Sequence, residues 1–253
     1  MTKTQRVDVF LKILRDLKTP ITEQTKILDL GCGAGLMVKA GREKGFEFFG
    51  AGFNLDDDFN TADQALVQNG ILREINPQPY RIPFDDCTFD IVISDQVFEH
   101  VMDYPTTLSE IHRVLKPGGS FLHIFPARYK PIEPHVFVPL GTMLRARWWL
   151  RSWAMIGVRN QFQKSMSAAE ATDANWTYLR QHTNYLSKRT LQQQFSRFFT
   201  DIQFVEKVFL KHSKRGRKVY QLSTLLPFLP KLYSAVGSRV AYGRRGGEST
   251  VTH

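Results

Sequence analysis

The chain has 253 residues, of which 42% are hydrophobic, and this length allows one large domain or two small ones. Its two cysteines, Cys32 and Cys87, match neither a metal-ligand spacing nor a disulfide framework, which favours a reducing compartment and therefore the cytoplasm. No apolar stretch reaches the roughly 18–20 residues of a membrane-spanning helix, and the N-terminus lacks the apolar core of a signal peptide. A disulfide scaffold and an integral membrane protein are thereby excluded.

The net charge of +10 is distributed unevenly along the chain. Residues 1–127 carry 13 Lys/Arg and 18 Asp/Glu, whereas residues 128–253 carry 21 Lys/Arg and 6 Asp/Glu, so the two halves have net charges of −5 and +15. Such a difference indicates that the second half meets an anionic partner, namely a phosphorylated substrate, a lipid surface or nucleic acid. The alternative is a solvated basic surface.

The predicted elements of the first half alternate between strands and helices. An amphipathic helix is expected within residues 1–20, and apolar runs bounded by turn residues predict the strands. The strands are expected at residues 27–30, 46–53, 70–75, 89–95 and 120–125, with helices at 36–44 and 57–68 and another that ends at the LKPGG sequence of residues 115–119. This alternation predicts a doubly wound, mostly parallel α/β sheet.

The second half departs from this rhythm. Residues 128–185 are rich in Trp, Arg and Pro, and we interpret them as a helical or irregular insertion after the fifth strand that binds substrate or forms a lid. A helix is expected at residues 186–199, and strand-like runs follow at 201–210 and 217–225. We expect a single domain over residues 1–253 with seven strands, ending in a frayed tail at residues 243–253.

A glycine-rich turn joins the first predicted strand to the helix that follows it. Gly31, Gly33 and Gly35 allow positive φ angles and close approach of a ligand to the backbone N–H groups. Leu36 occupies the position of the last glycine in the dinucleotide fingerprint G-x-G-x-x-G, which argues against a nicotinamide dehydrogenase. We therefore expect a nucleotide-like ligand that is not a dinucleotide.

Three segments in order and spacing carry a family resemblance: ILDLGCGAG, IPFDDCTFDIVISDQVFEHVMD and EIHRVLKPGGSF. Together they resemble the class I S-adenosylmethionine-dependent methyltransferases of the small-molecule type, over about residues 25–125. The resemblance implies a Rossmann-like fold, S-adenosylmethionine as cofactor, and a loop containing Gly31, Cys32, Gly33 and Gly35 around its methionine and ribose portions. It also implies that Asp29 binds near the cofactor's amino group, the alternative being a carboxylate that caps the loop. Cys32 is expected to fill space rather than act as a nucleophile.

Two positions depart from the family pattern. Gly52 stands where the family usually has an acid for the ribose hydroxyls, so we expect Asn54, or else Asp56, to replace it. Gln78 stands where an acid often binds the adenine amino group, and its carbonyl can still accept that proton. Tyr80 is expected to flank the base or to pack at a strand edge.

Polar residues follow the fourth strand. Ser94, Asp95 and Gln96 are expected to line the cofactor site, because open α/β sheets bind ligands at the carboxyl ends of their strands. For Glu99 and His100, which precede the next helix, we favour capping or packing over direct catalysis.

Transfer of a methyl group to a hydroxyl requires an aligned acceptor and removal of a proton, and histidine suits the second task near neutral pH. The proline-stiffened sequence KPIEPHVFVPL follows the fifth strand and contains Glu133 and His135, which are the catalytic candidates, with His135 as the base. The alternative is a structural or substrate-orienting histidine. No metal site is expected.

Residues 145–159 interleave arginines with tryptophans, which suits either a helix in the headgroup region of a membrane or a lid packed on the domain. With the basic second half, this favours a small-molecule, glycan or lipid-linked anionic acceptor and, as an alternative location, the inner face of a membrane. A nucleic-acid methyltransferase is a competing interpretation, although SDQV at residues 94–97 differs from the N/D-P-P-Y/F motif of base methylation. A cofactor-binding module without catalysis is a third, and the missing ribose acid supports it.

Overall fold

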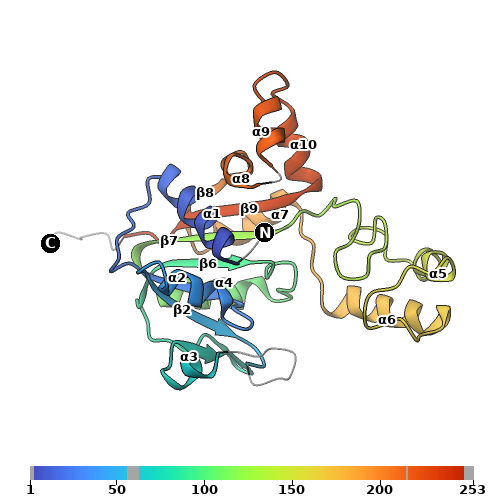
Figure 1. Cartoon of the computed structure of the whole chain (residues 1–253), viewed down its shortest axis with the longest axis horizontal. Helices are drawn as coiled ribbons and strands as arrows, with labels where there is room; N and C mark the ends of the chain where they lie inside the picture. The colour runs from blue at the N-terminus through green and yellow to red at the C-terminus, as the bar shows by residue number, and fades with distance from the viewer. Residues whose placement is uncertain (1–2, 56–62, 215, 248–253) are drawn as a thin grey trace.

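The computed structural model of the chain describes residues 3–55, 63–214 and 216–247 (Figure 1). The first half contains α1 (Lys3–Asp16), β1 (Lys26–Leu30), α2 (Leu36–Arg42), β2 (Glu47–Gly52), α3 (Gln64–Gln68), β3 (Leu72–Glu74), β4 (Asn76–Pro77), β5 (Tyr80–Arg81), β6 (Phe89–Asp95), α4 (Tyr104–Val114) and β7 (Leu115–Pro126). The second half contains α5 (Arg147–Met155), α6 (Ala168–Gln181), α7 (Lys188–Phe195), β8 (Thr200–Phe204), α8 (Glu206–His212), α9 (Arg217–Leu222), α10 (Leu229–Val236) and β9 (Ser238–Arg244).

Seven strands form one sheet in the order β3-β2-β1-β6-β7-β9-β8. The first five of these run parallel, and β9 is antiparallel to both of its neighbours. The predicted doubly wound, mostly parallel sheet is therefore confirmed. The strand order reverses at β1, which lies between β2 and β6, and a reversal of this kind opens a ligand-binding crevice at the carboxyl ends of the strands.

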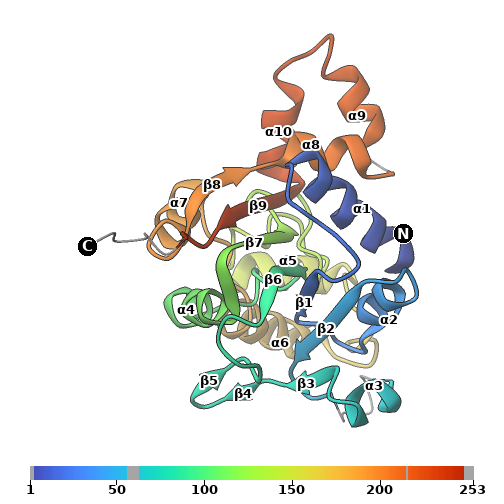
Figure 2. The same ribbon diagram turned by 90° about the vertical axis from the view of Figure 1, so that its left-hand side faces the viewer.

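Two apolar layers cover the two faces of the sheet, because successive side chains of a strand point to opposite sides. Ile27 belongs to the core cluster that includes α1, α2 and α8, whereas Leu28 belongs to the cluster that includes α4 and α7 (Figure 2). In α1, the helical spacing of Val7, Phe10 and Leu14 places all three on one fully buried face. Each such side chain contributes about 1.5–3 kcal/mol of hydrophobic stabilisation, so α1 is an integral layer of the domain.

The C-terminal part differs from the sequence prediction. The predicted strand at residues 201–210 ends at Phe204 and continues as helix α8, and the strand predicted at 217–225 is instead helix α9. The last strand of the sheet is β9, which includes Gly243 and Arg244 of the predicted frayed tail. Arg245 also is held, since its guanidinium donates to the carbonyl of His112 at 2.8 Å. Residues 248–253 of that tail lie outside the described part of the chain.

Strand β7 is the fifth strand of the seven-stranded sheet along the chain, and the insertion expected after the fifth strand follows it. Its helices α5 and α6 pack on each other through a small separate cluster of Val136, Val138, Leu150 and Leu179, and they project from the sheet (Figure 1). A second excursion, α8 to α10, separates β8 from β9, and α9 and α10 stand away from the sheet at another corner (Figure 2). Among the described residues, every helix falls short of the length and apolar character needed to cross a membrane.

Candidate functional site

The glycine turn after β1 has the backbone that its sequence predicts. Gly31, Gly33 and Gly35 have φ angles of +76°, +51° and +73°, a region that other L-residues rarely adopt. The N–H groups of Gly31 and Cys32 both donate to the carbonyl of Ala51, at 2.7 and 3.1 Å, which ties the turn to the end of β2. Helix α2 begins directly after Gly35, so the turn is held between two elements of the sheet layer.

A cavity of about 620 Å³ lies beside this turn. Its walls come from the end of β1, the β4–β5 hairpin, the loop between β6 and α4, and the first turn of α4. Of the cofactor-binding candidates, it brings together Gly31, Gln78, Tyr80 and Gln96. This volume and the mainly apolar lining with a few polar groups are typical of small-molecule sites.

The hairpin supplies an aromatic wall. The rings of Tyr80 and Phe53 lie 6.2 Å apart and both line the cavity, which makes a surface suited to a flat base. Burial raises the pKa of the Tyr80 hydroxyl to about 12, so this side chain stays neutral. Phe53 was not among the sequence-predicted residues, although it directly follows the second strand.

Gly52, which stands where the family usually has an acid for the ribose hydroxyls, is closely surrounded by other atoms. A Cβ added to Gly52 would lie 3.3 Å from the sulfur of Cys32, and β3 places Glu74 opposite Gly52 in the sheet. Asn54, the expected replacement, does not line the cavity, and its backbone N–H donates to Glu74 Oε1 at 3.2 Å. Asp56 lies outside the described residues. Glu74 is therefore a carboxylate near this edge that sequence reasoning missed.

Asp29 and Cys32 lie beneath the cavity. Asp29 is 3% exposed and is paired in β1 with Gly50 on one side and Ile93 on the other. Cys32 is buried, and this burial raises the pKa of its thiol, with the charge of Asp29 acting in the same direction. A neutral buried thiol is a poor nucleophile, in keeping with a space-filling role.

Ser94 and Asp95 lie away from the cavity. Ser94 is fully buried, and its hydroxyl lies 2.9 Å from Nδ1 of His123 on β7. Asp95 forms an ion pair with Arg6 of α1, with Nε and Oδ2 2.6 Å apart. Asp95 lines a second cavity of about 490 Å³, and Gln96 borders both that cavity and the first one.

The loop between β6 and α4 contains residues whose roles differ from those expected from the sequence. Asp103 is the N-cap of α4, since its carboxylate accepts the N–H of Thr106 at 3.1 Å, so the capping role considered for Glu99 and His100 is wrong. His100 instead lines the 620 Å³ cavity, and its Nδ1 donates to the carbonyl of His182 at 2.7 Å. Burial, as the largest cause, lowers the pKa of His100 below the ordinary histidine value.

Glu133 and His135 form a hydrogen-bonded pair in the insertion. Glu133 is fully buried and accepts four hydrogen bonds, from the side chain and N–H of His135, the N–H of Val136 and the hydroxyl of Tyr185, at 2.6 to 2.7 Å. Burial alone would raise the pKa of Glu133, but these hydrogen bonds lower it below its ordinary value. The ionised carboxylate holds the Nδ1 proton of His135, so in the neutral imidazole Nε2 is the accepting nitrogen. His135 lines a third cavity, of about 500 Å³, within the insertion.

The part of the chain that forms this site is similar to a known protein family. Residues 28–123 match the model of a family described as a methyltransferase domain. This part of the chain is therefore a methyltransferase domain. The match covers the strands and loops that build the 620 Å³ cavity and ends before the insertion that contains Glu133 and His135.

Curated relatives match the same region. The chain is 32% identical to a demethylmenaquinone methyltransferase of Bacillus subtilis over 40% of its own length and 45% of that protein. It is 33% identical to a ubiquinone biosynthesis O-methyltransferase of Cereibacter sphaeroides over 43% and 44% of the two chains, and 32% identical to an uncharacterised protein of Methanocaldococcus jannaschii over 44% and 45%. The chain thus spans less than half the length of these relatives.

Solved structures share the fold at low sequence identity. A phosphoethanolamine N-methyltransferase of Haemonchus contortus in complex with S-adenosylmethionine matches with a TM-score of 0.52 at 15% identity, over 95% of this chain and 52% of that one. A methyltransferase of Mesorhizobium loti matches with a TM-score of 0.51 at 16% identity, over 94% and 100%. These similarities extend the class I fold beyond residues 28–123 to nearly the whole chain.

Proposed function

We propose that the protein is an S-adenosylmethionine-dependent methyltransferase that acts on a small anionic acceptor through a hydroxyl group. The observation that carries the proposal is the 620 Å³ cavity beside the positive-φ glycines at the end of β1. The residues present fit the cofactor, because Gly31 brings its backbone to the cavity wall, the Tyr80–Phe53 wall is aromatic, and Gln78 and Gln96 supply amide groups. S-adenosylmethionine, when bound, supplies an electrophilic methyl group on a sulfonium.

The proposed role of this chain in the transfer step is alignment of the acceptor and removal of its proton. His135 suits the second task, since Glu133 holds its Nδ1 proton at 2.7 Å and orients Nε2 as the accepting atom. Tyr185 and Val136 hold Glu133 in turn, so that the pair is positioned before substrate arrives. His100 lines the cofactor cavity and its ring lies 4.8 Å from the ring of His135, which supports a role for His135 beside this cavity.

The negative charge of the acceptor is inferred from the second cavity. Arg6, Lys130 and Lys214 line it together with Asp95, and Asp95 is already paired with Arg6. Gln96 is shared with the cofactor cavity, so an acceptor that extends from the transfer site into this cavity would meet Lys130 and Lys214. A carboxylate or phosphate on the acceptor is the chemistry that these ammonium groups favour.

The proposed membrane contact concerns the insertion helix α5 and an anionic lipid surface. Trp148, Met155 and Ile156 have exposed fractions of 63%, 69% and 72%, and Arg151 is exposed beside them. Trp149 and Trp153 instead face the insertion cluster, and Trp149 Nε1 donates to the carbonyl of Pro139 at 2.8 Å. The helix therefore combines an inward face with an outward apolar and basic face, as interfacial helices do.

The test is calorimetric titration with S-adenosylmethionine and S-adenosylhomocysteine, followed by transfer of a labelled methyl group to a panel of acceptors. The panel contains phenolic and aliphatic hydroxy acids, phosphorylated sugars, lipid-linked glycans and RNA. We expect binding of both cofactor forms and labelling of a hydroxyl in an anionic small molecule. Labelling of RNA with a steep salt dependence would overturn the acceptor class. Absence of any cofactor binding would overturn the proposal as a whole and leave a degenerate module.

A further inference from the structure

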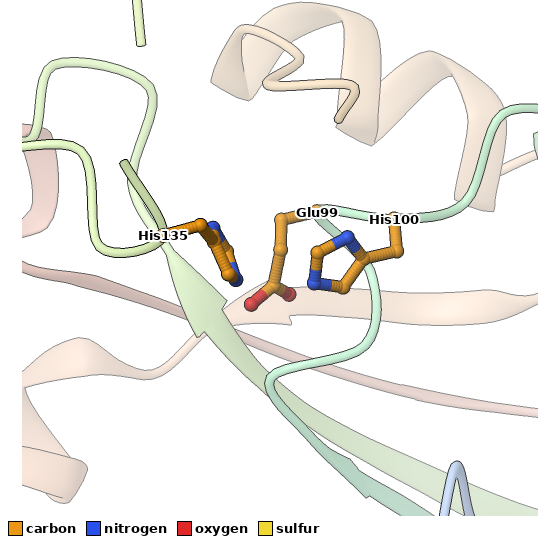
Figure 3. A group of neighbouring side chains, drawn as sticks. All are labelled: Glu99, His100 and His135. Atoms are coloured by element: carbon orange, nitrogen blue, oxygen red, sulfur yellow. The ribbon is translucent and has the colours of Figure 1, made fainter. Parts of the chain in front are cut away.

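Glu99, His100 and His135 form a cluster at the junction of the β6–α4 loop and the insertion (Figure 3). One ligand atom of each side chain lies within 4.8 Å of those of the other two. His135 is 35 positions beyond His100 in the chain, so the folding of the insertion against the β6–α4 loop creates the cluster. Methyl transfer by a histidine base uses only one of these three side chains.

The carboxylate of Glu99 is buried without compensation. Glu99 is 1% exposed, and neither of its oxygens accepts a hydrogen bond from another residue in the described part of the chain. A buried carboxylate without partners costs several kcal/mol, which is why such groups are ordinarily paired or bound to a metal.

Both histidines are oriented toward this carboxylate by hydrogen bonds on their other nitrogen. Nδ1 of His100 donates to the carbonyl of His182, and Nδ1 of His135 donates to Glu133, each at 2.7 Å. Nε2 is therefore the ring nitrogen of each histidine that remains for a further ligand, and in Figure 3 one ring nitrogen of each histidine is turned toward Glu99. A metal-binding histidine almost always makes such a second hydrogen bond, to a carbonyl or a carboxylate, and here both histidines do.

We infer that Glu99, His100 and His135 bind one divalent transition-metal ion. Two imidazoles and one carboxylate are ligands that suit zinc, manganese, iron and cobalt, and a set of three leaves at least one coordination position open. The three ligand atoms lie within 4.8 Å of one another, and metal–ligand bonds of about 2.0–2.2 Å require them to move closer together. The carboxylate of Glu99 can make this movement without breaking a hydrogen bond, because neither of its oxygens has a partner among the described residues. The negative charge of Glu133 behind His135 adds to the attraction for a cation.

The position of the ion suggests its use. His100 lines the cofactor cavity and His135 lines the cavity inside the insertion, so the open coordination position lies between the two. With the ion bound, His135 Nε2 would be its ligand and not the base, and the ion would hold the acceptor oxygen and lower the pKa of its hydroxyl group. This use rests on the proposed function, whereas the binding site itself does not.

The experiment measures metal binding directly on the full chain. The protein is treated with a chelator, dialysed and titrated with cobalt chloride, and the visible absorption of protein-bound cobalt is recorded. We expect saturation at one equivalent, displacement of cobalt by zinc, and a higher melting temperature with zinc present. The Glu99→Gln variant keeps the shape of the side chain and should bind cobalt at least about a hundredfold more weakly, while Glu133→Gln should lose about 10–100-fold.

The controls separate this inference from the proposed function. His112→Gln removes a histidine of α4 outside the cluster and should leave cobalt binding unchanged. His135→Asn, at a half-buried position, is the second variant should Glu99→Gln fail to fold. Absence of a cobalt spectrum, or equal cobalt affinity of wild type and both cluster variants, overturns the inference. Cofactor calorimetry on the same preparation decides the proposed function independently, so either result can fail alone.

Discussion

Arg6 of α1 and Asp95 at the end of β6 form a partly buried ion pair that joins residues 89 positions apart. Arg6 also lies over the rings of Phe10 and Phe209, at 5.7 and 5.6 Å from their centroids. The N-terminal helix is thus fixed to the edge of the sheet at which the cofactor cavity opens.

Arg6→Met should lower the free energy of unfolding by about 1–3 kcal/mol, because it leaves Asp95 without its charged partner. Urea denaturation measures this change. The exposed pair of Lys44 and Asp8 supplies the control, and Lys44→Met should cost no more than about 1 kcal/mol. Equal effects of the two substitutions would contradict a special role for Arg6.

Gly31→Ala should weaken S-adenosylmethionine binding by at least about tenfold, since the φ of +76° is strained for alanine by about 1–2 kcal/mol. The new methyl group would also lie 2.3 Å from Val97 Cγ2, so the cavity wall would have to shift. Gly45→Ala is the matched control, because Gly45 has a φ of +84° and open space around it. Calorimetry should show normal cofactor affinity for this control, and a similar loss in both variants would contradict the prediction.

His123 should make stability depend on pH. Burial lowers its pKa well below the ordinary value of about 6.5, so below pH 6.5 the unfolded chain binds a proton that the folded chain does not. Stability should therefore fall by about 1.4 kcal/mol per pH unit as pH decreases from 6.5 toward the folded-state pKa. His123→Phe keeps the stacking with Phe121, whose ring lies 4.8 Å away, and should remove this part of the dependence in denaturation curves recorded across pH.

His135→Gln should lower kcat for the best acceptor by about a hundredfold to ten-thousandfold, the usual contribution of a positioned base. The affinity for S-adenosylmethionine should change by less than about twofold, because His135 does not line the cofactor cavity. His212→Gln, which removes a histidine paired with Asp16, is the control for activity. Steady-state kinetics with unchanged kcat in His135→Gln would exclude the assigned role.

Two neighbouring tryptophans should respond differently to truncation. Trp148→Ala should reduce binding to phosphatidylserine vesicles by about tenfold with little change in stability, since its side chain is exposed. Trp149→Ala should lower the free energy of unfolding by about 3 kcal/mol, because its ring packs in the insertion and its Nε1 is hydrogen-bonded. Vesicle sedimentation and denaturant melts check the pair, and vesicle binding that is unchanged in Trp148→Ala would count against the membrane contact.

The parallel half of the sheet was predictable because its strands are apolar runs separated by turn residues. Residues 27–30 and 89–95 were recognisable as buried strands, and the glycines after β1 required the positive φ angles that the structure has. The C-terminal part was not predictable in this way. The RKVYQL sequence of α9 has no clear strand or helix period, and strand β9 adjoins a run of glycine and arginine that resembles a tail.

The candidate site was predictable only where its residues lie close together in the sequence and reach the cavity through local structure. Gln78 and Tyr80 reached the cavity because a hairpin follows β3 directly. Ser94 did not reach it, since strand alternation turns its hydroxyl toward His123. The approach of His135 to Glu99 depends on how the insertion packs against the β6–α4 loop, and nothing in the local sequence encodes that distance.

Gln96 has a left-handed backbone, with φ of +61°, and its N–H is anchored to the carbonyl of Ile124 at 2.8 Å. Its side chain lines both the 620 Å³ cofactor cavity and the 490 Å³ cavity that contains Lys130 and Lys214. A ligand in one cavity that favours one rotamer of Gln96 changes the shape of the other cavity and therefore its affinity for a second ligand. By thermodynamic linkage, the second ligand changes the affinity for the first by the same factor. We therefore expect the affinities for cofactor and for acceptor to be coupled through a single amide.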